Sequence, residues 1–230
     1  MREIVMDTET TGLDPNSGDR IVEIGAVELF NHMPTGKTYH QYINPQRDMP
    51  EGAFAVHGLS AEFLSDKPLF KDIAQEFLDF AGDSKMVIHN AAFDMKFLNA
   101  ELKWLDRPEL PWAQALDTLA IARKKFPGAQ NSLDALCRRF GITTERELHG
   151  ALLDSEILAE VYLELIGGRQ PDFALSVVSN DDATDNGINA SWSPPKRPTQ
   201  LPSRITEAEL EAHKEFVGKM GEAAVWTKFK

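Results

Sequence analysis

Cysteine is almost missing from this chain: Cys137 is the only one among 230 residues. No internal disulfide can therefore form, and a reducing, cytoplasmic setting is expected. Cys137 lies among apolar residues at helical spacing, which favours a small buried side chain over a nucleophile. Long apolar runs are missing too. None reaches the roughly 20 residues of a membrane-spanning helix, and the first residues lack the long apolar region of a secretory signal.

Positive charge is scarce as well. The chain has 24 Lys and Arg residues against 36 Asp and Glu residues, which gives a net charge of −12 at pH 7. This excludes a protein that binds nucleic acid by itself through a broadly basic surface, so another component would have to deliver such a substrate. A local basic patch remains compatible with the net charge. Residues 123–125 and 138–139 could form one, although exposed charges that keep the protein soluble are the commoner explanation.

The pattern of apolar residues predicts an α/β fold. Strands are predicted over residues 2–7, 20–30, 37–43 and 85–89. Helices are predicted over residues 69–81, 91–105, 115–125, 131–140 and 150–166. Asn131 or Ser132 is the expected N-cap of the fourth helix. Three strands joined by short turns, followed by alternating helices and strands, predict a mixed sheet with helices packed on its faces.

The composition changes after residue 168. Residues 176–205 are rich in Ser, Asn, Asp and Pro, and such a segment cannot bury enough apolar surface to offset its ordering entropy. We therefore predict a folded domain of ordinary size over residues 1–170, a flexible linker over 171–205 and a separate tail over 206–230.

The tail begins with a helix signal. Thr206 and Glu209 have the spacing of a capping box, which predicts a helix over 206–217. A lone helix of this length is marginal in water. Because its apolar residues are followed by Trp226 and Phe229, docking on another protein is favoured over independent folding.

Four acidic residues occupy places from which they could meet. Asp7 and Glu9 share one face of the first strand. Asp94 lies in the first turn of a helix directly after a strand, at the edge where α/β sheets commonly place ligands, and Asp154 lies early in another helix. Each alone has a plainer explanation, as a solvated strand end or a first-turn acid. Two carboxylates about 4 Å apart repel by about 4 kcal/mol at an effective dielectric of about 20. A cluster of four therefore predicts one or two divalent cations and attack on a phosphodiester.

His149 precedes Asp154 by five residues. That spacing is about 140° of rotation along a helix, so a helical His149 would not share the face of Asp154. In a loop before the helix, beside Gly150, its imidazole could reach the same site and take a proton from water near neutral pH. The alternative is a histidine at the helix entry with no catalytic task.

Four segments in order match a known pattern. They are 7–12 (DTETTG), 56–59 (VHGL), 89–94 (HNAAFD) and 148–154 (LHGALLD). The chain resembles the exonuclease superfamily with four acids and a histidine, and within it the proofreading subunits of bacterial DNA polymerase III, over about residues 1–168. The resemblance implies a ribonuclease-H-like fold and metal-dependent 3′→5′ removal of mispaired nucleotides from a growing DNA end.

The resemblance also implies roles for the matching positions. Asp7, Glu9 and Asp154 would hold the cation that activates water, and Asp7 would touch a second cation that Asp94 supports through water. The cations would be Mg²⁺ or Mn²⁺. His149 would be the general base.

A pocket for the terminal nucleotide is implied as well. Its expected lining residues are Asp7, Glu9, His57, His89, Phe93 and Asp154. For Phe93, packing in the core is the alternative. One position departs from the pattern: related proteins often have a Glu five residues before His57, where this chain has Gly52. Glu51 lies one residue earlier, and no role is assigned to it.

Partners are implied by the same resemblance. Residues 206–230 would bind the catalytic (alpha) subunit of the polymerase. Residues 170–175 (QPDFAL) are similar to a sliding-clamp-binding peptide, with an ordinary linker entrance as the alternative. A small theta-like subunit could bind the exonuclease domain.

Two other functions stay open at this point. An RNA-trimming exonuclease of the same superfamily would share the site, and only the acidic charge and the tethered tail argue against it. A catalytically silent scaffold would use the fold and the tail to join partners, although it would not need the complete set of four acids and His149.

Overall fold

The computed structural model describes residues 1–143, 148–167 and 205–221. The chain divides into two units, Met1–Leu175 and Ser176–Lys230, and each is described by itself. The proposed linker over 171–205, except its last residue, lies outside the described residues. So do the peptide at 170–175 and the Trp226 and Phe229 anchors. No helix among the described residues is both long and apolar enough to cross a membrane.

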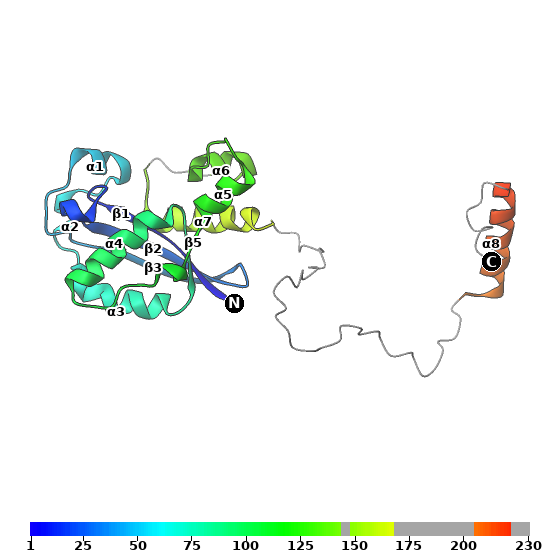
Figure 1. Ribbon diagram of the computed structural model, residues 1–230, viewed down its shortest axis with the longest axis horizontal. Helices are drawn as coiled ribbons and strands as arrows, with labels where there is room; N and C mark the ends of the chain where they lie inside the picture. Colours follow the sequence, from blue (N-terminus) through cyan, green and yellow to red (C-terminus); the bar gives the residue numbers. More distant parts are fainter. Residues whose placement is uncertain (144–147, 168–204, 222–230) are drawn as a thin grey trace, which may run out of the picture. The chain divides into compact units, whose positions relative to one another are not determined.

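A five-stranded mixed sheet forms the centre of the first unit (Figure 1). Its order is β3-β2-β1-β4-β5, and the strands are β1 (Arg2–Thr10), β2 (Ile21–Phe30), β3 (Met33–Tyr42), β4 (Lys85–Ile88) and β5 (Ala115–Asp117). Strand β2 runs antiparallel to both β1 and β3, whereas β4 runs parallel to β1 and β5 runs parallel to β4. This confirms the predicted mixed α/β sheet. The carboxyl ends of β1, β4 and β5 consequently meet at one edge.

Helices cover both faces of the sheet. Helices α3 (Phe70–Ala81) and α4 (Ala91–Trp104) pack on the face that carries Ile4 and Met6, whereas α7 (Ala151–Leu165) packs on the face that carries Val5. The alternation of side chains along β1 therefore feeds two separate cores. Helices α5 (Thr118–Lys125) and α6 (Leu133–Phe140) share a third apolar cluster with α7. Ser132 is the N-cap of α6, which confirms one of the two predicted alternatives.

The sequence prediction missed three short elements. Residues 115–117, expected to begin a helix, instead form β5 by pairing with β4, and Asp117 then caps α5 through a 3.0 Å bond from the amide of Leu119. Three residues are too few to show a strand period. Two helices between β3 and α3 were not predicted, α1 (Glu51–His57) and α2 (Ala61–Leu64). Short 3₁₀ turns at Pro15–Ser17 and Trp112–Gln114 complete this unit.

The described part of the second unit is helix α8 (Glu207–Met220). The capping box is confirmed: the hydroxyl of Thr206 accepts a hydrogen bond from the amide of Glu209, whose carboxylate accepts one from the amide of Thr206. The helix runs three residues further than predicted. No residue of it is buried, and Leu210 and Phe216 are exposed, so its apolar side chains form no core among the described residues 205–221.

Candidate active site

Strand β1 carries the first two acids to the edge of the sheet. Asp7 lies opposite Gly25 of β2, Glu9 lies opposite Glu23, and a bulge follows Glu9. Asp7 and Glu9 leave the same face of the strand by alternation, which is the face covered by α7. Asp7 is half-buried and Glu9 is buried.

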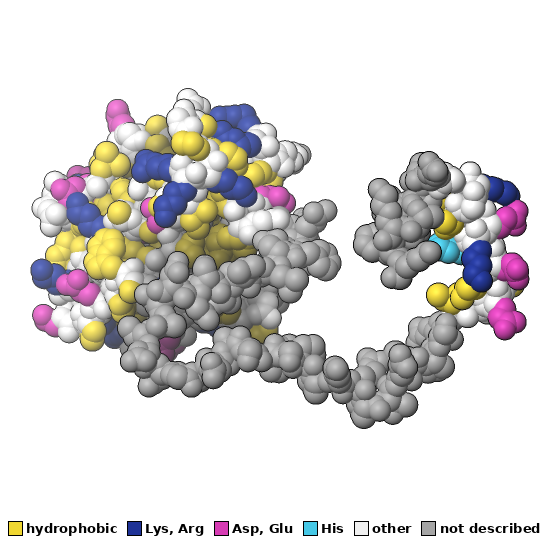
Figure 2. Space-filling model, turned by 45° about the vertical axis from the view of Figure 1, so that its right-hand side comes forward, with side chains coloured by type: hydrophobic (Ala, Val, Ile, Leu, Met, Phe, Trp, Pro, Cys, Tyr) yellow, Lys and Arg dark blue, Asp and Glu magenta, His cyan; other side chains and the backbone are white. Residues whose placement is uncertain are grey.

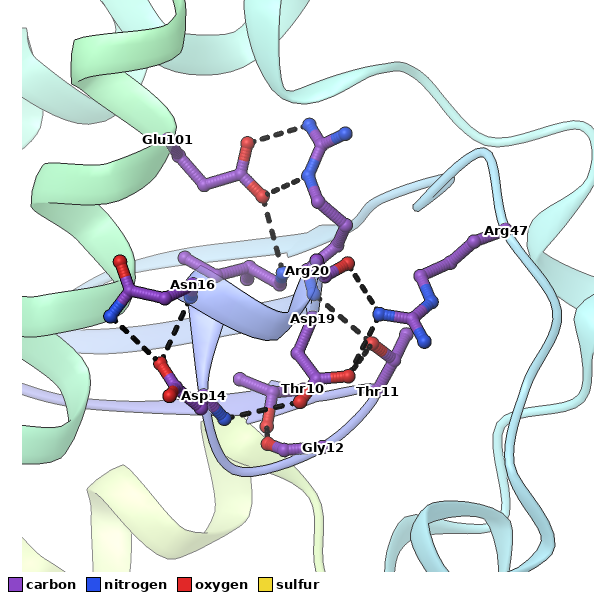
Figure 3. Close-up of polar contacts among 11 residues, drawn as sticks. Thr10, Thr11, Gly12, Asp14, Asn16, Asp19, Arg20, Arg47 and Glu101 are labelled. Atoms are coloured by element: carbon purple, nitrogen blue, oxygen red, sulfur yellow. Dashed lines mark hydrogen bonds and ion pairs between the residues drawn. The ribbon is translucent and has the colours of Figure 1, made fainter.

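The turn that follows β1 is held by a network of polar contacts (Figure 3). The carboxylate of Asp19 accepts hydrogen bonds from the amide of Asp14 at 3.1 Å, from Arg47 at 2.8 Å and from the hydroxyl of Thr11 at 3.3 Å. Arg20 binds both oxygens of the buried Glu101 at 2.7 Å. Such bidentate contacts fix geometry as well as charge. The end of β1, where Glu9 lies, is therefore held rigidly in place.

Helix α7 and the loop before it bring the last acid and the histidine. The helix begins at Ala151 with Gly150 as N-cap, so His149 lies in the entry loop, as predicted from its spacing. The amide of His149 donates to the carbonyl of Val56 at 3.1 Å. Leu148 lies so close to Gly58 that a Cβ on Gly58 would come within 2.6 Å of it. The end of α1 thus supports the histidine loop.

Glu9, His149 and Asp154 form one group. Each offers a ligand atom, and these atoms lie within 4.8 Å of one another. Nδ1 of His149 is 2.9 Å from Oδ2 of Asp154. Glu9 and Asp154 are buried, whereas the His149 side chain is 46% exposed. Two carboxylates and an imidazole at this separation suit a divalent cation bound at the edge of the solvent.

Asp94 reaches the same strand end from the other side. It lies in the first turn of α4, is only 2% exposed, and accepts a 2.7 Å hydrogen bond from the hydroxyl of Thr8. Thr8 stands between Asp7 and Glu9 and points to the opposite face by alternation. Asp94 is therefore outside the group of Glu9, His149 and Asp154, although all four acids belong to elements that meet at the end of β1. Its role at a second cation stays a prediction.

The protonation of Asp94 is set by its burial. The pKa of Asp94 is raised from 3.8 to about 7, chiefly by burial and to a smaller extent by the charge of Asp117, although the Thr8 hydrogen bond acts to lower it. A cation beside the carboxyl would favour the ionised form. Without a cation, the ionised form is costly in this position.

Replacing Asp94 by asparagine is expected to change how stability depends on pH. Because the folded-state pKa of Asp94 lies above its unfolded value, the metal-free protein should lose stability as the pH rises from about 4 through about 7. The Asp94→Asn variant lacks this loss and should be more stable than the wild type at about pH 8. Thermal unfolding in a chelator at about pH 5 and about pH 8 measures the difference. Equal pH slopes for the two proteins would contradict the prediction.

Three of the six residues predicted to line the nucleotide pocket, those without a carboxylate, have separate surroundings. His57 ends α1, is buried, and accepts a 3.0 Å hydrogen bond at Nδ1 from the amide of Leu59; burial lowers the pKa of His57. His89 follows β4 and has its Nδ1 3.0 Å from the hydroxyl of Thr118, and burial lowers the pKa of His89 as well. Phe93 packs against Phe97 with ring centroids 4.9 Å apart and belongs partly to the core.

Three contributors to the site were not found by sequence reasoning. The first is Thr8, whose hydroxyl donates a hydrogen bond to Asp94. Its position between Asp7 and Glu9 in the sequence could have drawn attention to it. Asp117 accepts hydrogen bonds from the amides of Asn90 at 3.1 Å and Leu119 at 3.0 Å, and so holds the starts of α4 and α5 together. Its place after an apolar run resembled that of Asp7 and could have drawn attention to it.

Gly25 is the third missed contributor, and it sets the distance between β2 and α7. A Cβ on this glycine would lie 2.1 Å from the carbonyl carbon of Ala151 and 2.1 Å from the amide nitrogen of Leu152. The hydroxyl of Ser155 donates to the carbonyl of Gly25 at 2.9 Å. The first turn of α7, which carries Asp154, is thereby pressed against the sheet opposite Asp7.

Comparisons with known proteins agree with this geometry. A family model described as Exonuclease matches residues 4–162. The chain is 52% identical over 227 residues to the DNA polymerase III subunit epsilon of Rickettsia conorii, covering 96% of both chains. It is 42% identical over 243 residues to the DNA polymerase III subunit epsilon of Escherichia coli K12, covering 98% of this chain and 97% of that one.

Solved structures show the same architecture. Exonuclease X in complex with 5′ overhanging duplex DNA is 28% identical, with a TM-score of 0.56, and the match covers 72% of this chain and 90% of that one. The nuclease domain of 3′hExo, a DEDDh family member bound to rAMP, is 18% identical, with a TM-score of 0.63 and coverage of 72% and 91%. The second likeness is one of fold alone.

Proposed function

The chain belongs to the exonuclease family, and within it to the DNA polymerase III epsilon subunits; from this membership we propose how its residues carry out proofreading. The protein is a 3′→5′ exonuclease that removes mispaired nucleotides from the growing DNA end. The observation that carries the assignment to particular residues is the group of Glu9, His149 and Asp154 at the end of β1. Glu9 from the first strand, Asp154 from helix α7 and His149 from the loop before that helix meet there.

The residues divide the work between charge and proton transfer. Asp7, Glu9 and Asp154 would hold one divalent cation, Mg²⁺ or Mn²⁺, and Asp7 would contribute to a second that Asp94 supports. When bound, such cations lower the pKa of a water molecule and neutralise the charge of the phosphate and the leaving oxygen. Terminal-nucleotide contacts are assigned to Asp7, Glu9 and Asp154 together with His57, His89 and Phe93.

His149 is the general base. With Nδ1 donating to Oδ2 of Asp154 at 2.9 Å, the lone pair is on Nε2, and this nitrogen accepts the proton of the attacking water. The half-exposed position of the side chain lets the proton pass on to solvent. The contact between the His149 amide and Val56 keeps the loop at the site during the reaction.

The remainder of the chain serves assembly in this proposal. Residues 1–170 form the exonuclease domain, 171–205 a flexible linker and 206–230 a tail that binds the catalytic (alpha) subunit of the polymerase in the cytoplasm. The exposed apolar side chains Leu210 and Phe216 of α8 support a docking role. The relatives from Rickettsia and Escherichia match this chain almost from end to end, tail included. A sliding clamp at 170–175 and a small theta-like subunit are further proposed partners.

A comparison of DNA and RNA ends tests the substrate. Purified protein with Mg²⁺ is expected to shorten a 3′-terminal single-stranded DNA at least about tenfold faster than an RNA of the same sequence, because a preference of this size needs only about 1.4 kcal/mol in the transition state. Addition of a chelator is the control. Faster turnover of the RNA would favour the RNA-trimming alternative, and no turnover of either with Mg²⁺ or Mn²⁺ would favour the silent scaffold.

A further inference from the structure

A hollow of about 570 Å³ lies between α5 and the loop that leads into α6. Its polar lining residues are His89, Arg123, Asn131 and Ser132. The walls are held in place by their own contacts: the side-chain amide of Asn131 donates to the carbonyls of Phe126 at 3.3 Å and Ala129 at 3.0 Å. Ser132 is the N-cap of α6, and its hydroxyl accepts a 3.3 Å hydrogen bond from the amide of Ala135. The hollow is therefore formed before any ligand arrives.

The surroundings of the hollow are the basic part of an acidic protein. Residues 118–140 contain five basic side chains and one acidic side chain, Asp134, in a chain whose net charge is −12. All five basic side chains are exposed. Figure 2 shows Lys and Arg side chains gathered in the upper part of the first unit, where Figure 1 draws α5 and α6. The local patch that the sequence permitted is present.

Two of these five cations have structural partners. Lys125 donates to the carbonyls of Glu164 and Leu165 at the end of α7, and Arg139 lies over the ring of Phe126 at 4.3 Å. Within the described ranges, none of the ion pairs involves Arg123 or Arg138. Arg123 is an exposed cation that lines the hollow. Its charge lowers the pKa of His89, together with the larger effect of burial.

The hollow borders the edge of the sheet where the acids lie. His89 follows β4 and is joined to Thr118, which follows β5. Asp117 connects this pair to the start of α4, the helix that carries Asp94. Neighbouring strands lie about 4.8 Å apart, so the hollow is displaced sideways from the active site by roughly 5–10 Å. A nucleic-acid strand crosses such a distance within a few nucleotides.

We infer that this hollow binds a backbone phosphate of the single-stranded DNA that enters the active site, upstream of the terminal nucleotide. The inference rests on the proposed function. A guanidinium matches a phosphate in both charge and geometry, and Ser132 with the first amides of α6 adds neutral donors at a helix N-terminus. A cationic subsite of this kind also explains how a protein with so much negative charge keeps hold of a polyanion beside four acidic residues.

The test compares a substrate that reaches the hollow with one that does not. Arg123→Ala is expected to lower kcat/KM about tenfold on a single-stranded oligonucleotide, mainly through KM. Hydrolysis of the 4-nitrophenyl ester of thymidine 5′-monophosphate, which has no upstream phosphate, should be unchanged. The slope of log kcat/KM against log salt should become shallower by about 0.7, the value for one contact to a single strand. Arg123→Lys should restore the slope.

Matched measurements keep the outcomes separate. Lys71→Ala removes an exposed cation from α3, on the other face of the sheet, and should leave both substrates unaffected. Equal losses on the ester and the oligonucleotide, or no loss on the oligonucleotide, would overturn the inference. Anisotropy of a fluorescent oligonucleotide in a chelator measures binding without turnover. If the wild type hydrolysed neither substrate, the proposed function would fail, and the anisotropy of Arg123→Ala against Lys71→Ala would still decide about the hollow.

Discussion

Replacing Asp154 by asparagine is expected to slow DNA hydrolysis by about 10³-fold. The substitution keeps the size of the side chain and can still accept a hydrogen bond from His149, which lies 2.9 Å away. It removes one of the two charges in the group with Glu9 and His149. A bound metal ion supplies several kcal/mol of transition-state stabilisation, and each 1.36 kcal/mol corresponds to a factor of ten in rate. Single-turnover rates on a 3′-labelled strand with Mg²⁺ measure the loss.

The same substitution is expected to stabilise the metal-free protein. Asp154 and Glu9 are both buried, and their like charges oppose folding when no cation lies between them. The thermal midpoint in a chelator should therefore rise in Asp154→Asn. With a cation at 100 times its Kd, the wild type should gain about 2.7 kcal/mol, and the variant should gain much less.

Glu156→Gln is the matched control for this experiment, because Glu156 lies on the exposed side of the same helix. It removes an equal charge two residues away and should change neither the rate nor the response to Mg²⁺. A lower midpoint for Asp154→Asn in the chelator would contradict the account, since it would mean that the protein itself already balances this charge. Normal turnover by Asp154→Asn would remove Asp154 from the site.

The sequence was sufficient for those parts of the site that depend on local geometry. The two-residue period of a strand sets Asp7 and Glu9 on one face whatever the rest of the fold does. The rotation of a helix similarly required His149 to lie before α7 if it was to meet Asp154, and the helix indeed begins at Ala151. Both conclusions use distances of five residues or fewer along the chain.

Local geometry did not reveal from which side Asp94 would approach the end of β1. Asp94 was correctly placed in the first turn of a helix after β4, yet the face from which that helix reaches β1 depends on how the chain crosses the sheet. The structure brings Asp94 to Thr8 and leaves it outside the group of Glu9, His149 and Asp154. Strand alternation puts Thr8 and Glu9 on opposite faces. The sequence did not show that Asp94 would contact Thr8.

Short elements were missed by the sequence prediction for a related reason. The three residues of β5 are a strand only because β4 supplies its hydrogen-bonding partner, and α1 and α2 contain too few turns to show a clear period. Missing α1 mattered for function, because the carbonyl of Val56 near its end accepts a hydrogen bond from the amide of His149. A contact between residues so far apart in the chain has no signature in either segment.

Replacing Gly25 by alanine is expected to disable the enzyme from a position that has no chemical group to offer. The added Cβ would lie 2.1 Å from backbone atoms of Ala151 and Leu152, and backbone in the first turn of a helix cannot turn aside as a side chain can. Helix α7 must therefore move away from β2, and the hydrogen bond from Ser155 to the Gly25 carbonyl must lengthen from 2.9 Å.

This displacement separates the two halves of the site. Gly25 pairs with Asp7 across the β1–β2 ladder, while α7 carries Asp154 and follows His149 directly. A misplacement of about 1 Å can cost about 100-fold in rate, so turnover should fall by at least about that factor. Overpacking costs about 1–3 kcal/mol, which lowers the thermal midpoint by roughly 2–4 °C per kcal/mol in a protein of this size.

Gly52→Ala is the comparison, because a Cβ on Gly52 would meet no atom within 4 Å. It should keep wild-type turnover and stability. The decisive measurement is the binding of Mn²⁺ to Gly25→Ala by calorimetry at a temperature well below its midpoint, where the protein is folded. Weakened Mn²⁺ binding is expected, because the ligands on β1 and α7 no longer face each other at the right distance. Unchanged metal binding and turnover would show that α7 can shift without carrying its carboxylate away from the strand.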